Sequence, residues 1–193
     1  LQANMALRST QNPAFYVKNN AALDFATYVL SGSAGLFTPE TGSTLLSANT
    51  SASGAINSSG ANGSVQTGKR SFTQTGVHYT FNAAAAQKTG TAIGKSGDIG
   101  NLTVNVASGL TLDTLCSLSG TLSLSNGILQ LGNQHLTITN SASGAISGAN
   151  SSRFIRTNGT GELRRAIASS GLPLTCLFPI GSSGDYTPAS FTF

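Results

Sequence analysis

The feature that most constrains this chain is a series of short runs in which apolar and polar residues alternate. The clearest runs cover residues 77–81, 102–106, 122–124, 129–131 and 136–138. A period of two places successive side chains on opposite faces, which is typical of a half-buried β-strand. Turn-forming dipeptides that contain glycine, such as Asn126-Gly127, separate the runs. The pattern therefore predicts an all-β protein.

The spacing of the runs fits two architectures. Antiparallel hairpins could form a sandwich, or each short strand could stack on the strand one full coil later in a solenoid. Gly, Ser, Thr and Asn supply 88 of the 193 residues, and charged residues only 8%. The polar positions of the runs are nearly all Ser, Thr or Asn, which form hydrogen-bonded ladders when they stack at the spacing of neighbouring strands. We therefore predict a parallel β-solenoid, or β-helix.

The same composition excludes several classes of protein. A helical bundle, a coiled coil or a nucleotide-binding α/β enzyme needs strong helix formers at helical spacing, and the chain has few. The six carboxylates, at positions 24, 40, 98, 113, 162 and 185, are far apart in sequence. No spacing of His and Cys typical of a zinc site occurs, nor any nucleophile elbow or phosphate-binding loop. We expect no enzymatic activity, no catalytic residues, no metal and no cofactor.

Charge and hydropathy bear on the partners. The net charge of +4 arises from ten basic and six acidic residues, so scarce acids produce the basic pI, and we expect no nucleic-acid binding. No stretch approaches 18 consecutive apolar residues, so we expect no membrane span. Four arginines, at 153, 156, 164 and 165, lie close together in sequence. They could bind an anionic glycan, but a solvated strand face is the favoured interpretation.

Changes of composition and residue pattern divide the chain into three parts. Residues 1–20 show no amphipathic helical pattern and are interpreted as an N-terminal extension or linking strand, and residues 21–150 are interpreted as the solenoid. Residues 151–193 bring the arginines and three prolines, and we expect a Pro-containing C-terminal β element there that is incomplete. The hexapeptide Ser-Ala-Ser-Gly-Ala-Ile occurs at 51–56 and again at 141–146, which indicates an internal repeat of about 90 residues.

The succession of segments resembles a known group of proteins. It is similar to the β-helical repeat regions of very large secreted surface proteins of Bacteroidetes-type bacteria, which the type IX secretion system exports. The similar segments, in the same order, are 23–33, 63–72, 78–90, 101–112, 120–148, 154–165 and 178–188. The resemblance implies an adhesin-like structural protein of the bacterial cell surface, and it carries no catalytic residues.

Two further features concern covalent chemistry. Cys116 and Cys176, the only cysteines, both lie among apolar residues. They are either two buried free thiols or a disulfide that ties the solenoid to the C-terminal element. Asp113-Thr114-Leu115 resembles the acceptor tripeptide for O-glycosylation of exported proteins in this bacterial group, which makes Thr114 a candidate glycosylation site.

The ends of the chain predict assembly. A solenoid exposes unpaired backbone groups at each end unless an element caps them. The sequence offers no convincing cap, so we expect that the chain continues in a longer polypeptide or that copies join head to tail. The candidate assembly strands carry Phe15 and Val17 at one end and Phe191 and Phe193 at the other.

These expectations combine into one functional hypothesis. The chain is interpreted as a structural or adhesive segment of an extracellular surface protein, with self-association into a fibre or stalk and surface glycans as candidate partners. The alternative is a carbohydrate-binding or carbohydrate-processing β-helix. Exposed Trp or Tyr would favour that alternative, but the chain has no Trp and only four Tyr.

Overall fold

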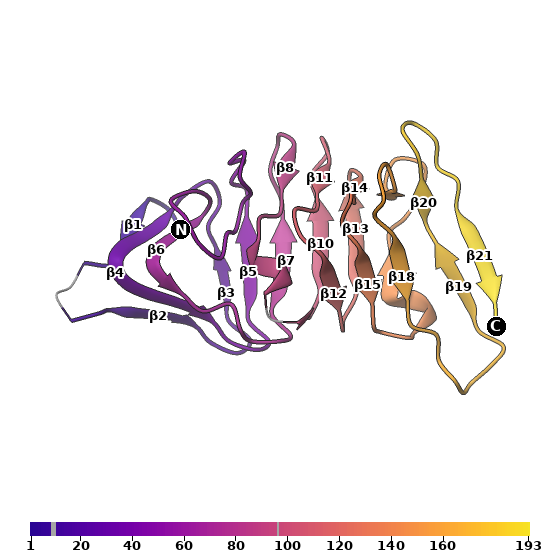
Figure 1. Ribbon diagram of the computed structural model, residues 1–193, viewed down its shortest axis with the longest axis horizontal. Coiled ribbons are helices and arrows are strands. Elements are labelled where there is room, and N and C mark those ends of the chain that lie inside the picture. Colours follow the sequence, from indigo (N-terminus) through magenta and orange to yellow (C-terminus); the bar gives the residue numbers. More distant parts are fainter. Residues whose placement is uncertain (9–10, 96) are drawn as a thin grey trace.

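The computed structural model describes residues 1–8, 11–95 and 97–193. The chain forms a parallel β-solenoid whose strands stack along one long axis, from the N-terminal end to the C-terminal end (Figure 1). Among the described residues the only helical segments are two 3-10 turns, η1 (Ala92–Gly94) and η2 (Ser143–Ala145). The predicted fold class is therefore confirmed. The scarcity of strong helix formers accounts for the absence of longer helices in this part of the chain.

Three parallel sheets run along the solenoid, and each of the four coils in its middle adds one strand to each sheet. The first sheet consists of β3 (Ala22–Asp24), β5 (Thr44–Ser47), β7 (His78–Phe81), β10 (Leu102–Asn105), β13 (Leu122–Asn126) and β16 (Ile146–Ser147). The second consists of β8 (Gln87–Lys88), β11 (Leu110–Thr111), β14 (Leu129–Gln130), β17 (Ile155–Arg156) and β20 (Ile180–Gly181). The third consists of β9 (Asp98–Ile99), β12 (Cys116–Leu118), β15 (Leu136–Ile138) and β18 (Leu163–Arg165).

A fourth parallel sheet forms the N-terminal end. Its strands are β1 (Met5–Ala6), β2 (Ala14–Val17), β4 (Leu30–Pro39) and β6 (Val65–Arg70). The ten-residue β4 pairs with both β1 and β2 along one edge and with β6 along the other. Gly32 of β4 has a φ of +138°, and a Cβ atom there would lie 2.5 Å from the carbonyl oxygen of Leu7. The glycine therefore permits the close approach of the N-terminal segment.

The C-terminal end differs from the rest of the molecule. β19 (Thr175–Phe178) and β21 (Ala189–Thr192) form an antiparallel pair, which lies at the yellow end of the ribbon (Figure 1). Between them, β20 pairs in parallel with β17 of the second sheet. The predicted C-terminal β element therefore exists, but it is limited to this pair.

The solenoid extends beyond the boundaries expected at residues 20 and 150. β1 and β2, which lie within residues 1–20, pair with β4 of the next coil. β17 and β18, which follow residue 150, extend the second and third sheets. The boundaries at 20 and 150 follow changes of composition, whereas membership of a solenoid depends on pairing with the neighbouring coil.

The core consists of inward-facing columns in which each side chain stacks on its counterpart one coil away. In the first sheet Tyr79, Leu102 and Leu122 occupy one column, and Phe81, Val104 and Leu124 the next. Ten apolar residues at alternating positions of these coils are buried, namely Leu102, Val104, Leu110, Leu112, Leu122, Leu124, Leu129, Leu131, Leu136 and Ile138. The alternation thus identified the inward face correctly.

The outward positions form polar columns. Thr80, Thr103, Ser123 and Ser147 follow one another across the first sheet. Small uncharged side chains in this arrangement stack without charge repulsion between coils, and the Ser123 hydroxyl pairs with that of Ser125 in its own strand at 3.3 Å. The coil-by-coil repetition of the solenoid is therefore visible in both its apolar and its polar columns.

The repeated hexapeptide does not occupy equivalent places. Ile146 belongs to β16 of the first sheet, where it stacks on Leu122. Ile56 instead donates its N–H to the carbonyl oxygen of Thr89, beyond the end of β8 in the second sheet. The expected repeat of about 90 residues is therefore not a structural repeat. The repeating unit is the single coil.

Candidate functional site

The carboxylates are dispersed, and most have a local structural partner. Asp113 Oδ2 accepts a hydrogen bond from Gly90 N–H at 2.7 Å. Asp98 Oδ2 accepts one from the Thr139 hydroxyl at 2.9 Å, two coils further along the third sheet. Glu40 pairs with Lys18 at 2.6 Å. Among the described residues no group of three or more His, Cys, Asp or Glu side chains could hold a metal ion.

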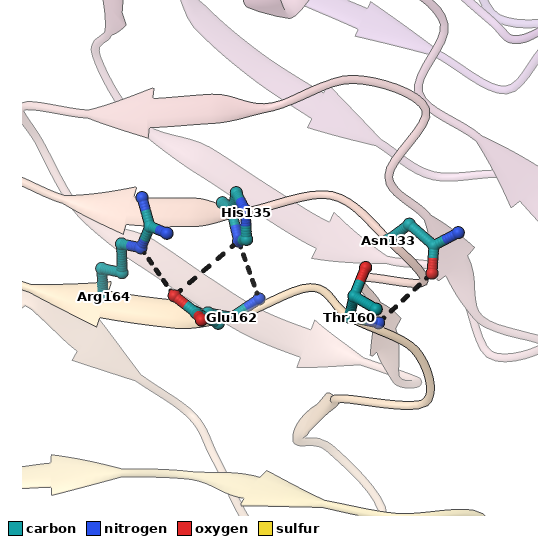
Figure 2. A network of polar contacts seen from close by, with 5 residues as sticks. All are labelled: Asn133, His135, Thr160, Glu162 and Arg164. Atoms are coloured by element: carbon teal, nitrogen blue, oxygen red, sulfur yellow. Dashed lines mark hydrogen bonds and ion pairs between the residues drawn. The ribbon is translucent and has the colours of Figure 1, made fainter.

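Both histidines link neighbouring coils. Asn101 N–H donates to His78 Nδ1 at 2.8 Å, and Glu162 N–H donates to His135 Nδ1 at 3.2 Å. Figure 2 shows the second contact beside the ion pair of Glu162 with Arg164, whose Nε lies 2.8 Å from Glu162 Oε2. The hydrogen bond and charge of Arg164 lower the pKa of the Glu162 carboxyl. The network is exposed, and it holds two coils together at the surface.

The four arginines that are close in sequence do not form one charged face. Arg156 lies in the second sheet and Arg164 on the outward face of the third. Arg153 donates to the carbonyl oxygen of Ser125 at 3.2 Å. Arg165 follows Ile138 in an inward column of the third sheet. The predicted solvated strand face therefore describes at most part of this group.

Arg165 closes the inward column at the C-terminal end. Its Nη1 donates to the carbonyl oxygen of Leu177 at 2.7 Å, and its Nη2 donates to that of Ala142 at 2.9 Å. The guanidinium carbon also lies 5.7 Å from the ring centroid of Phe178. Arg165 thereby ties the antiparallel C-terminal pair to the last complete coil.

The cysteines are two buried free thiols. Cys116 lies in an inward position of β12, and Cys176 lies in β19, opposite Phe191. Of the two arrangements that the sequence left open, the structure has the unbridged one. Burial, and to a smaller extent the negative charge of Asp98, raises the pKa of the Cys116 thiol to about 12. Such a thiol is a small hydrophobe and not a nucleophile.

The other residues singled out by sequence lie at the surface or at the ends. Thr114 is half-buried in the connection between β11 and β12, and its Oγ1 lies against Gly94 of η1. Phe15 and Val17 lie in β2, which pairs with β4, and Phe191 lies in β21, which pairs with β19. Phe193 follows directly after β21 and exchanges backbone hydrogen bonds with Leu174.

A polar cleft that sequence reasoning missed surrounds Arg70. It has two adjoining hollows of about 330 and 350 Å³, and both are lined by Ser58, Ser59 and Arg70. Strand β6 and the loop around residue 60 form the first hollow. Phe72 and Lys95 line the second. Residues up to 62 positions apart in sequence converge here, and no local motif signals that convergence.

A hydrogen-bonded frame holds this cleft in place. All three nitrogens of the Arg70 guanidinium donate to backbone carbonyl oxygens. Nε donates to Thr67 at 3.0 Å and Nη1 to Asn57 at 3.1 Å. Nη2 donates to Gly60. Asn57 Oδ1 accepts a hydrogen bond from Thr91 N–H at 3.2 Å, which connects the loop to the segment that leads to Lys95. Burial lowers the pKa of the Arg70 guanidinium from its ordinary value.

Comparison of the chain with protein-family models, with curated proteins and with solved structures finds no match. None of the helices in the described part of the chain is long and apolar enough to cross a membrane.

Proposed function

We propose that this chain is a structural or adhesive segment of an extracellular bacterial surface protein, of the kind exported by type IX secretion, and that it assembles end to end into a fibre or stalk. The surface origin rests on the ordered resemblance of the sequence segments. The end-to-end assembly rests on the shape of the solenoid and on the two ends of its described part.

The observation that carries the assembly proposal is the state of these ends. Within the described chain, β1, β2 and β3 each pair along one edge only. Apolar side chains at this end are only partly covered, namely Leu1, Met5, Leu7, Phe15 and Leu23. At the other end β21 pairs only with β19, and Phe191 and Phe193 are 52% and 47% exposed. Open strand edges beside exposed apolar surface favour addition of a further strand, which either a longer polypeptide or a second copy of this chain supplies.

A head-to-tail contact of this kind does not close on itself, so it produces a filament. Light scattering of the purified chain at micromolar concentration should therefore show particles that grow with concentration, and negative-stain electron microscopy should show extended fibres. Phe193→Lys should reduce growth because it places a charge at the C-terminal edge. Leu115→Lys is the matched control, because Leu115 is 60% exposed in the middle of the solenoid.

Two results would contradict the assembly proposal. One is a stable monomer whose backbone amides in β2 and β21 are protected from hydrogen exchange. The other is equal growth of the wild type and the Phe193→Lys variant.

A further inference from the structure

We infer that the cleft around Arg70 and Lys95 binds the oxyanion substituent of an acidic saccharide. The inference deepens the adhesive part of the proposed function, since it names a ligand class and a site. It does not depend on end-to-end assembly, so a binding experiment on the chain tests it separately.

The first argument is uncompensated positive charge. Among the described residues, the ion pairs use other cations: Lys18 with Glu40, and His135 and Arg164 with Glu162. The residues that line the two hollows include Arg70 and Lys95 and no carboxylate. Two positive groups in one concave, partly desolvated surface attract an anion.

The second argument is the geometry of the Arg70 guanidinium. Each terminal nitrogen carries two N–H groups. Nη1 gives one to Asn57 and Nη2 gives one to Gly60, both through carbonyl oxygens. One N–H on each nitrogen therefore remains for a ligand oxygen, and hydrogen bonds from a guanidinium to a carboxylate or sulfate oxygen are charge-assisted and strong. The carbonyl contacts hold the guanidinium in place before the ligand arrives, which reduces the entropy lost on binding.

The third argument is the character of the remaining surface. Hydroxyl and amide side chains line the first hollow, namely Ser33, Ser58, Ser59 and Gln66, whereas the hydroxyl of the buried Thr67 donates to the carbonyl oxygen of Lys69. Gly60 adds open space, because no atom lies within 4 Å of the Cβ position that it lacks. Phe72, which is only 4% exposed, gives the second hollow a small apolar element. Many small hydrogen-bonding groups beside one apolar surface suit a polyhydroxylated ring, and the combined hollows exceed what a simple inorganic anion needs.

The experiment measures binding by NMR titration and isothermal calorimetry, at low ionic strength and again near physiological ionic strength. Three probes of equal length are used: an oligogalacturonide, which carries carboxylates, a sulfated gluco-oligosaccharide, and a neutral malto-oligosaccharide. We expect one or both acidic probes to bind, with amide shifts concentrated at residues 58–61 and 66–70, and the neutral probe to bind at least tenfold more weakly. The two acidic probes distinguish a carboxylate ligand from a sulfate ligand.

Matched variants locate the site. Lys95→Gln should weaken binding by about fivefold to tenfold, because it removes a charge at the cleft. Lys69→Gln removes the same charge from an exposed residue of the same strand as Arg70 that does not line either hollow, so it should change the affinity by less than about twofold. Arg70→Gln should weaken binding further, but it also frees the loop around residue 60, so Lys95→Gln carries the test.

Three results would overturn the inference. They are equal affinity for the neutral and acidic probes, equal losses in Lys95→Gln and Lys69→Gln, and no binding of either acidic probe at concentrations up to about 10 mM.

Discussion

Gln87 is a polar side chain in an otherwise apolar column, and its replacement probes how the solenoid tolerates that break. It is 2% exposed and stacks on Leu110 of the second sheet. Its Nε2 donates to the carbonyl oxygens of Ser47 at 2.8 Å and Asn49 at 3.0 Å. Its Oε1 accepts the N–H of Ala83 at 3.2 Å. The side-chain amide thus pairs with three backbone groups. The carbonyl oxygen of Ser47 also accepts the N–H of Asn82 at 3.1 Å, so the groups that depend on Gln87 are the Asn49 carbonyl and the Ala83 N–H.

The magnitude follows from what each substitution leaves unpaired. Gln87→Leu matches the leucine that follows in the column, but it removes all three hydrogen bonds. A buried backbone group without a partner costs about 1 to 3 kcal/mol, and the N–H of the buried residue Ala83 would be such a group. The half-buried Asn49 carbonyl would add a smaller cost, whereas the Ser47 carbonyl keeps the N–H of Asn82. Burial of the leucine side chain offsets about 1 to 2 kcal/mol of that cost. We expect a net loss of about 0.5 to 3 kcal/mol in the free energy of unfolding.

Gln87→Glu keeps nearly the same side-chain shape but replaces the Nε2 donor with a carboxylate oxygen, which can only accept hydrogen bonds. The carboxylate oxygen that replaces Nε2 would face the carbonyl oxygens of Ser47 and Asn49, and the N–H of Ala83 would donate to the other oxygen. No cation would balance this buried charge, so we expect a loss of about 3 to 5 kcal/mol at neutral pH. Folding would raise the pKa of the introduced carboxyl above its unfolded value of about 4.3. The extra loss of stability is therefore small below about pH 4 and grows as the pH rises through the pKa of the folded state.

Urea unfolding followed by circular dichroism at acidic and neutral pH measures both variants against the wild type. Gln130→Glu is the control, because Gln130 occupies an outward, half-buried position in the same sheet. It should change stability by less than about 0.5 kcal/mol. Wild-type stability of Gln87→Leu, or a loss in Gln87→Glu that does not vary with pH, would refute the role assigned to the three hydrogen bonds.

Other predictions concern the columns, the turns and the thiols. Leu124→Asp should cost about 4 kcal/mol or more in urea unfolding because Leu124 is fully buried, whereas Ser123→Asp on the outward face should stay near the wild type. Gly127→Ala should lower the melting temperature far more than Gly132→Ala; both glycines have positive φ, but a Cβ atom at Gly127 would lie 1.8 Å from a backbone oxygen and one at Gly132 would contact nothing. The thiol of Cys116 should resist iodoacetamide at about pH 8 until the chain unfolds, because its pKa of about 12 keeps it protonated and burial shields it; rapid labelling of the native protein, read by mass spectrometry, would contradict this.

The class of fold and the inward face of the strands could be predicted from the sequence. Alternation with a period of two depends only on local geometry, so it places Leu122 and Leu124 on one face whatever the partner strands are. The outward residues, such as Thr103 and Ser123, are small and uncharged, so they can stack from coil to coil. This property can be read from the sequence, and it favoured stacked parallel strands over hairpins. These predictions are confirmed by the register of the first sheet.

Only the tertiary structure decided which coil each segment joins. Neighbours in one column are 34 residues apart between Leu45 and Tyr79, but 20 apart between Leu102 and Leu122. Coils of unequal length hide the repeat from the sequence, and for that reason the pairing of residues 1–20 and the unequal placement of the two hexapeptides were missed. The cleft is missed for the same reason. Arg70 and Lys95 line one hollow because a strand and a loop from different coils pack together. Strand periodicity carries no information about such packing.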